Sequence, residues 1–279
     1  MNILKFIESF TDEKLLNSKG SRRESFNQFK ALGTNGAMSA LPLGLLTFAS
    51  GQKANAATTA FAATAETPTQ ALQLALTLEY LEDDFYEMAL AMNNLIPAAD
   101  RAVFEQIALH ENAHVQLLRS ALGANVIEKP EFDFTVNGAF DTFTNYQTFL
   151  ALAQAFEDTG VRAYKGQAGN LITQPALLEA ALQIHSVEAR HATQVRRLRD
   201  RLGLDNIKGW VTGDSRGTLP SQTQAVYNGE GNTNQAGFNT ASVTATNGPA
   251  IPSAAGAESF DEPLSGTEAT TIASLFIVP

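Results

Sequence analysis

The sequence predicts an all-α protein, built as a four-helix bundle with one long crossover and followed by a loop-rich C-terminal extension. Three observations predict this fold class. Residues 67–204 contain four long segments, each bounded by helix-start and helix-stop signals. The connections between them are short, long and short, which is the pattern of a bundle with one crossover. One pattern of Glu, Tyr and His also occurs twice along these segments.

The first helix is expected to start at Thr67-Pro68, because threonine caps helices and proline is favoured at the first helical position. It is expected to run over 67–96 and to stop ahead of Pro97. Asp100 is expected to cap the second helix, since its carboxylate accepts from free backbone N–H groups. The second helix would end at Leu122-Gly123, where glycine favours a helix C-terminus.

The third helix is expected over 145–168, with Gly169 closing it. The fourth begins at Gln174-Pro175 and ends near Leu202-Gly203. The long connection, residues 126–144, separates the second helix from the third. Two short hairpin loops on either side of one long crossover distinguish this topology from a simple up-down-up-down bundle.

The extension, residues 205–279, is rich in Gly, Asn and Thr and has few residues to bury. This composition predicts a long loop rather than a second core. Near its end, Ser265 and Glu268 have the spacing of a capping box, which predicts a short helix that docks back on the bundle. Trp210 is expected to anchor the extension.

The first residues, 1–56, are interpreted as a leader with a twin-arginine export signal, joined to the bundle by a linker at 57–66. Arg22-Arg23 precede an apolar run at 37–49 that is too short and too weak to span a membrane. Small residues at 54–56 suit a signal-peptidase site. The sequence therefore predicts a periplasmic or otherwise exported protein. The alternative is a cytoplasmic protein whose N-terminal helix precedes a flexible linker.

The strongest functional signal is the repeated pattern, Glu-x6-Tyr followed by Glu-x-x-His. Its members are Glu79, Tyr86, Glu111 and His114 in the first half, and Glu157, Tyr164, Glu188 and His191 in the second. Seven helical residues turn by about 700°, close to two full turns, so the Glu and Tyr of each pair share a face. A step of three places each Glu beside its His. The pattern therefore predicts that four carboxylates and two imidazoles point into one bundle interior.

Burying four carboxylates in an apolar interior is costly unless a positive charge compensates them. A single Glu-x-x-His is usually a solvated helix face, but two copies at matched spacing favour metal ligation. Two Glu-x-x-His pairs and one further glutamate from each remaining helix suit a two-metal centre. Carboxylate and imidazole ligands without a thiolate favour iron or manganese.

Several neighbouring residues keep alternatives open. Glu82 lies one turn from Glu79 and would either replace it or add to it as a ligand. His110 and His185 are either residues that support the ligands or line an access channel, or ordinary structural histidines. Gly160 takes on the third helix the place of Glu82 on the first, and its missing side chain would leave room for dioxygen, peroxide or solvent.

These residues resemble the ferritin-like superfamily, and more narrowly its exported bacterial and desiccation-related members. The resemblance covers residues 67–204. It implies a site for two iron ions, with manganese possible, and metal ligands Glu79, Glu111, His114, Glu157, Glu188 and His191. It also implies that Tyr86 and Tyr164 act in catalysis as hydrogen-bond donors that orient ligand carboxylates.

Composition excludes several classes of function. The net charge of −10 argues against a nucleic-acid partner, and the absence of cysteine excludes disulfides, iron–sulfur clusters and a rubredoxin-like iron site. Met88 and Met92 are expected to fill the core rather than bind haem. The long leader and extension argue against a hollow ferritin cage, although a smaller homo-oligomer stays open.

Two functions follow from the pattern and the resemblance. The first is a di-iron oxidoreductase, of the ferroxidase or peroxidase/catalase-like type, that oxidises ferrous iron with dioxygen or removes peroxide under oxidative stress. The alternative is a non-catalytic structural module, associated with stress or desiccation, whose metals stabilise the bundle.

Overall fold

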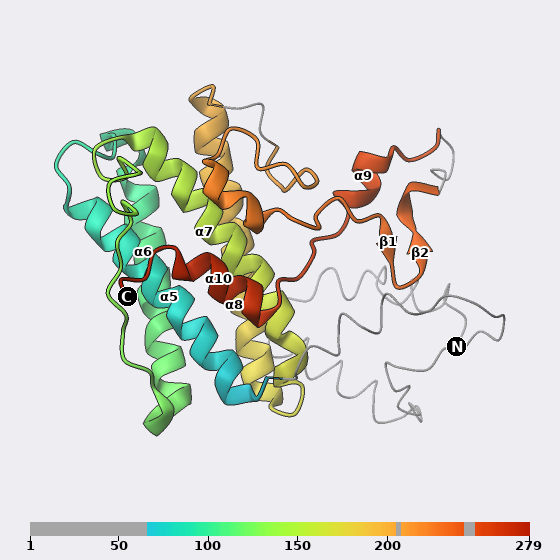
Figure 1. The fold of residues 1–279 in the computed structure, drawn as a ribbon, viewed down its shortest axis with the longest axis horizontal. Coiled ribbons are helices and arrows are strands. Elements are labelled where there is room, and N and C mark those ends of the chain that lie inside the picture. Colours follow the sequence, from blue (N-terminus) through green and yellow to red (C-terminus); the bar gives the residue numbers. More distant parts are fainter. Residues whose placement is uncertain (1–65, 205–207, 243–248) are drawn as a thin grey trace, which may run out of the picture. The chain divides into compact units, whose positions relative to one another are not determined.

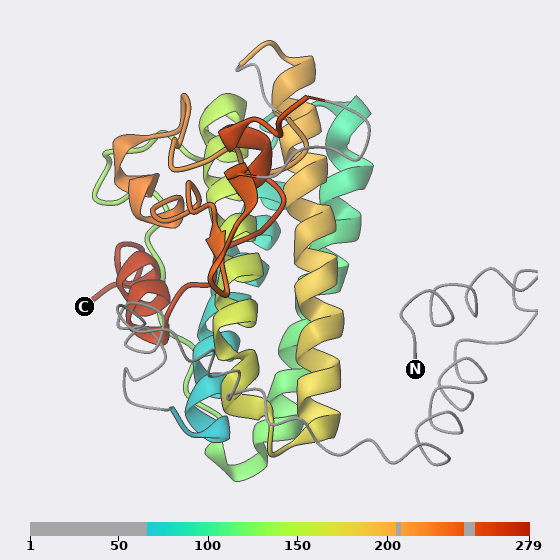
Figure 2. The same cartoon turned by 90° about the vertical axis from the view of Figure 1, so that its right-hand side faces the viewer.

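The structure is a computed structural model that describes residues 66–204, 208–242 and 249–279 (Figure 1). The described residues form an all-α bundle followed by a loop-rich extension, as the sequence predicts. The long helices are α5 (Pro68–Ala91), α6 (Ala98–Leu122), α7 (Tyr146–Gln167) and α8 (Pro175–Arg201). In Figure 2 they run side by side, with the extension along the α7 side.

Local sequence signals explain most of the helix ends. The Thr67 side chain accepts from the Gln70 backbone, and the Gln70 side chain accepts in return from the Thr67 N–H. The Asn145 side chain caps α7 by accepting from Gln147 N at 2.9 Å. Gly203 follows α8 with a φ of 67°, a left-handed conformation that glycine adopts without strain. The predicted starts at Thr67 and Asn145 and the predicted stop at Gly203 are confirmed.

The predicted end of the first helix is wrong. Helix α5 stops at Ala91 rather than Ile96, because Met92 turns to an extended conformation and Asn94 adopts a φ of 65°. The resulting turn buries Leu95 and Ile96, each only 6% exposed. Burial of these two apolar side chains outweighs continuation of the helix.

The predicted capping role of Asp100 is also wrong. Helix α6 begins at Ala98, so Asp100 lies inside its first turn. Its buried carboxylate accepts instead from Tyr146 Oη at 2.8 Å and from Arg201 Nη2 at 2.5 and 2.7 Å. Asp100 therefore ties the start of α6 to the start of α7 and the end of α8.

The remaining elements are short. They are η1 (Gly123–Asn125), η2 (Ala168–Leu171), η3 (Ser221–Val226), η4 (Thr240–Ser242), β1 (Asn234–Gln235), β2 (Phe238–Asn239), α9 (Ser253–Ala257) and α10 (Gly266–Ser274). The two strands pair antiparallel. Gly169 lies within η2, so α7 tightens into a 3₁₀ turn instead of stopping at a left-handed glycine.

The crossover between α6 and α7 packs against both the core and the chain's last residues. Phe134 from this segment is buried, and its ring centroid lies 5.3 Å from that of Phe85. The backbone of the crossover also pairs with the segment after α10. Asp133 N donates to Phe276 O at 2.8 Å, and Val278 N donates to Glu131 O at 2.9 Å. The crossover and the C-terminal segment therefore hold each other in place.

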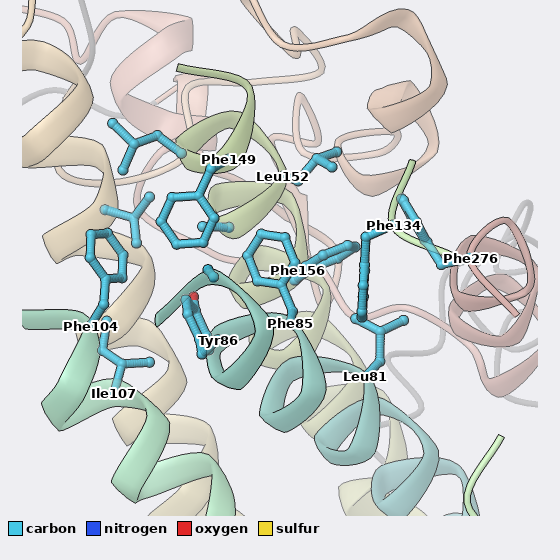
Figure 3. Close-up of a cluster of buried hydrophobic side chains, with 14 of the residues drawn as sticks. Leu81, Phe85, Tyr86, Phe104, Ile107, Phe134, Phe149, Leu152, Phe156 and Phe276 are labelled. Carbon is cyan, nitrogen blue, oxygen red and sulfur yellow. The ribbon is translucent and has the colours of Figure 1, made fainter. Parts of the chain in front are cut away.

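A cluster of aromatic rings fills the bundle at one end of the predicted site (Figure 3). The Phe85 centroid lies 5.0 Å from Phe149 and 4.9 Å from Phe156. Each such pair contributes about 0.5–1.5 kcal/mol beyond its burial. Tyr86 belongs to the same cluster and is fully buried, so its hydroxyl is held in one position.

The extension docks on α7 through a buried arginine. Arg162 Nε lies 2.7 Å from Glu230 Oε1, and Arg162 Nη2 donates to Asn228 O at 2.9 Å. Helix α10 crosses α5 and α7 (Figure 1), and its predicted capping box of Ser265 and Glu268 is confirmed. The extension thus packs against the bundle through Arg162, η3 and α10.

Two surface features bear on the expectations. Met88 and Met92 are 39% and 36% exposed, so the prediction that they fill the core is wrong. The predicted leader, which contains Arg22 and Arg23, lies outside the described residues. Residues 57–65 of the predicted linker also lie outside them. No helix in the described ranges has the length and apolar character to cross a membrane.

Gly166 lies where the extension crosses α7 most closely. A Cβ at this position would lie 1.8 Å from the Leu264 carbonyl oxygen. We expect Gly166→Ala to lower the free energy of unfolding by about 1–3 kcal/mol through overpacking, as measured by urea denaturation. Gly169→Ala is the matched control, because nothing lies within 4 Å of a Cβ there. Equal losses in both variants would contradict this packing.

Candidate metal centre

The four long helices bring the six predicted ligands together. Helix α5 carries Glu79, α7 carries Glu157, and α6 and α8 each carry a Glu and a His. Two overlapping groups have potential ligand atoms that all lie within 4.8 Å of one another. The groups are Glu79, Glu111, His114 and Glu188, and then Glu111, Glu157, Glu188 and His191.

Each imidazole faces three carboxylates. His114 Nδ1 lies 2.9 Å from Glu111 Oε2, and 3.1 Å from oxygens of both Glu79 and Glu188. His191 Nδ1 lies 2.8 Å from Glu111 Oε1, and 3.2 Å from oxygens of both Glu157 and Glu188. Glu111 and Glu188 therefore each face both imidazoles, with one carboxylate oxygen toward His114 and the other toward His191. Glu79 and Glu157 each face one imidazole alone.

This arrangement of side chains could hold a metal ion, and protons alone satisfy it poorly. A single Nδ1–H can make one good hydrogen bond, yet three carboxylate oxygens converge on each ring nitrogen. Glu111 Oε1, Glu157 Oε2 and Glu188 Oε1 are buried and lie within 3.2 Å of an imidazole nitrogen, yet none accepts a well-formed hydrogen bond within the described part of the chain. A metal ion held by these carboxylates and imidazoles would supply the missing partners.

The protonation of the metal-free site reflects the same crowding. Burial, followed by the charge of Glu188, raises the pKa of Glu79 to about 8. Burial also raises the pKa of Glu157 well above its usual range. Burial disfavours imidazolium, but the facing carboxylates outweigh it and raise the pKa of His114 to about 12. Burial likewise disfavours the Glu188 carboxylate, but its close contacts with both imidazoles outweigh burial and lower the pKa of Glu188 to about 2.

The two predicted tyrosines bond crosswise between the halves of the repeat. Tyr164 Oη donates to Glu79 Oε1 at 2.5 Å, and Tyr86 Oη donates to Glu157 Oε1. The second oxygen of each glutamate faces an imidazole. Burial raises the pKa of both phenols well above the usual range, so they stay protonated donors. Each tyrosine thus fixes the orientation of a carboxylate that faces one imidazole.

Glu82 is buried beside this centre but belongs to neither ligand group among the described residues. Burial raises its pKa well above the usual range, with a smaller contribution from Glu188. A Cβ on Gly160 would lie 3.4 Å from both Glu82 Oε1 and Glu188 Cγ. Gly160 therefore lets the α7 backbone lie close to Glu82 and Glu188, with room for a methyl group between them.

The two remaining histidines differ. His185 Nδ1 lies 2.8 Å from the Val161 carbonyl oxygen, which is a structural contact. His110 Nδ1 lies 2.9 Å from His191 Nε2, and His110 Nε2 lies 2.8 Å from the Gln106 amide nitrogen. With Nδ1 of His191 facing the carboxylates, its Nε2 is the ring atom that bonds with His110. The sequence did not reveal this link, because it depends on contact between α6 and α8.

The second half of the repeat has no counterpart of His110. The residue before Glu111 is His110, whereas the residue before Glu188 is Val187. The position next to His191 therefore has a hydrogen-bonded path to the exposed side chain of Gln106. The two halves match in their ligands and differ in this outer contact.

Comparison with protein families supports the assignment of this region. A family model described as a ferritin-like domain matches residues 67–201. Comparisons with curated proteins and with solved structures give no significant match.

Metal binding is expected to release protons at about pH 7. With a pKa of about 8, the Glu79 carboxyl group is mostly protonated in the metal-free site, and His114, with a pKa of about 12, is an imidazolium. Both must lose a proton to bind a cation, so affinity rises with pH. For each proton released, the metal affinity rises about tenfold per unit increase in pH. Titration calorimetry with manganese(II), in two buffers of different ionisation enthalpy, measures this release. Binding without proton release would contradict the described protonation.

Proposed function

Residues 67–201 belong to the ferritin-like domain family, and on this premise we propose that they hold two iron ions in a redox-active centre, with manganese as the second choice. The physiological reaction would be oxidation of ferrous iron by dioxygen, or removal of peroxide, under oxidative stress. The observation that carries this proposal is the pair of carboxylates, Glu111 and Glu188, that each face both imidazoles.

The side chains serve this chemistry in distinct ways. Bound iron or manganese would supply the electron transfer that no side chain here provides. The two imidazoles fix one position each, while carboxylates can change between terminal and shared binding as the charge of the site changes. Tyr86 and Tyr164 hold the carboxylates of Glu157 and Glu79 in position through hydrogen bonds. The contact of His110 Nδ1 with His191 Nε2 restrains the orientation of the His191 ring, with its Nδ1 facing the carboxylates.

The alternative proposal is a structural module. In it the ions only stabilise the bundle, and the extension mediates assembly or surface contact during desiccation. The extension's packing on α7 through Arg162 and Glu230 favours neither function over the other. The two proposals differ in whether the loaded protein turns over its substrate.

The double variant Glu111→Ala/Glu188→Ala separates these functions. Metal content is measured by elemental mass spectrometry, together with thermal stability and consumption of peroxide and ferrous iron. A catalytic centre predicts that turnover falls to the rate of the free ions, while the melting temperature falls by no more than about 5 °C. A structural centre predicts no turnover in either protein, and a metal-dependent rise in melting temperature that the variant loses.

The matched control is Glu105→Ala/Glu179→Ala, which removes exposed glutamates from the same two helices. It should keep both metal content and turnover. Wild-type protein that holds less than one ion per chain after reconstitution would contradict both proposals.

Gly160→Ala tests whether the space beside Glu82 admits the oxidant. The added methyl group meets its nearest neighbours at 3.4 Å, so the variant should fold and bind metal normally. We expect peroxide or dioxygen to react at least about tenfold more slowly in stopped-flow measurements, because the methyl group fills this space. Unchanged rates would place the oxidant's entry elsewhere.

We also propose that the protein is exported by the twin-arginine route through Arg22 and Arg23, that it binds no nucleic acid, and that it forms a homo-oligomer smaller than a cage. Export in the folded state would allow the metals to be loaded first. Cytoplasmic retention of an Arg22→Lys/Arg23→Lys variant, with wild-type protein exported, is the expected result in cell fractionation.

A further inference from the structure

A pocket separate from the candidate metal centre lies at one end of α7 and α8, where the extension covers the bundle. Its volume is about 190 Å³. It is lined by Gln154 from α7, by Arg196 and Arg199 from α8, and by residues of the extension that include Trp210 and Tyr227. None of the six predicted metal ligands lines it.

The pocket is lined by positive charge. Its cationic side chains are Arg196, Arg199, Lys208 and Arg216. Among the described residues no Asp or Glu lines it, but Asp158 pairs with Arg196 and Glu258 pairs with Lys208 behind the lining. Four cationic groups against two carboxylates leave a local excess of positive charge, and low-dielectric walls focus the potential of such an excess. The pocket therefore favours an anion.

The guanidinium groups are held in place before any ligand arrives. Arg196 is 3% exposed and donates to Asp158 Oδ2 at 2.5 Å. Arg199, also 3% exposed, donates to Gln154 Oε1 at 2.5 Å. Arg216 donates to backbone carbonyls, including that of Gly217 at 3.2 Å. Ordered guanidiniums match the two oxygens of a carboxylate or phosphate, and little side-chain entropy is lost on binding.

An aromatic ring forms another part of the wall. Trp210 is 55% exposed, yet its indole N–H donates to Glu258 Oε2 at 2.9 Å. Lys208 Nζ lies 5.8 Å from the centre of this ring and 2.7 Å from Glu258 Oε1. The indole is thus fixed beside the cationic groups, where it can contact a planar ring. The prediction that Trp210 anchors the extension accounts for its link to Glu258 but not for its open face.

We propose that this pocket binds a small organic anion that carries a carboxylate or phosphate group on a planar ring. Guanidinium groups, Arg216 among them, contact the oxyanion, and Trp210 contacts the ring. The site stands on its own lining residues and does not depend on the metal centre.

Trp210 is the only tryptophan in the sequence, so its fluorescence reports on this pocket alone. The full chain is titrated with benzoate, phenyl phosphate and inorganic phosphate, at constant ionic strength set with sodium chloride. We expect a saturable change with benzoate or phenyl phosphate. The dissociation constant should rise at least about tenfold in Arg216→Gln, and by a smaller factor in Lys208→Gln.

Arg101→Gln is the control, because Arg101 lies on α6, pairs with Glu105 and does not line the pocket. It should bind as the wild type does. Lys208 is half exposed, so its variant remains informative even if Arg216→Gln does not fold. A response that never saturates, or equal affinity in Lys208→Gln and Arg101→Gln, would overturn the proposal. Binding of inorganic phosphate as tightly as phenyl phosphate would overturn the role of the ring.

Discussion

The structure depends on the burial of four glutamates inside one apolar bundle. Glu79, Glu111, Glu157 and Glu188 are all fully buried, and their oxygens converge on only two imidazoles. Hydrogen bonds from protonated groups do not satisfy all of these carboxylates, because some of their buried oxygens accept no well-formed hydrogen bond in the described residues. Uncompensated charge in such a place costs several kcal/mol per group. The bundle therefore buries a group of carboxylates and imidazoles that could hold a metal ion.

The packing around the centre keeps these groups in position. The crosswise bonds of Tyr86 and Tyr164 join the two halves of the repeat through the very carboxylates that face the imidazoles. Tyr86 is held by the aromatic cluster, which the crossover completes with Phe134. The segment after α10 in turn pairs with the crossover. Elements far from the ligands thus restrict how far the ligand side chains can move.

The sequence was enough to predict which residues share a helix face. It was not enough to predict which distant segments contact one another. Helical periodicity is local, so the spacing of Glu79 and Tyr86, or of Glu188 and His191, was enough to place each pair on one face. Whether Asp100 caps a helix or binds Arg201 depends on where α8 ends, and periodicity says nothing of that. The contact of His110 with His191 and the docking of the extension by Arg162 also join distant segments. The cationic pocket was missed for the same reason.

The most direct test is a crystal structure of the iron- or manganese-loaded protein, with anomalous diffraction collected at the absorption edge of the metal. The account predicts two anomalous peaks, one beside Nδ1 of His114 and one beside Nδ1 of His191, with Glu111 and Glu188 bound to both. A single peak, or peaks bound at Glu82 instead of Glu79, would contradict the assigned ligands. No peak between the four helices would contradict the central claim that the buried carboxylates exist to bind metal.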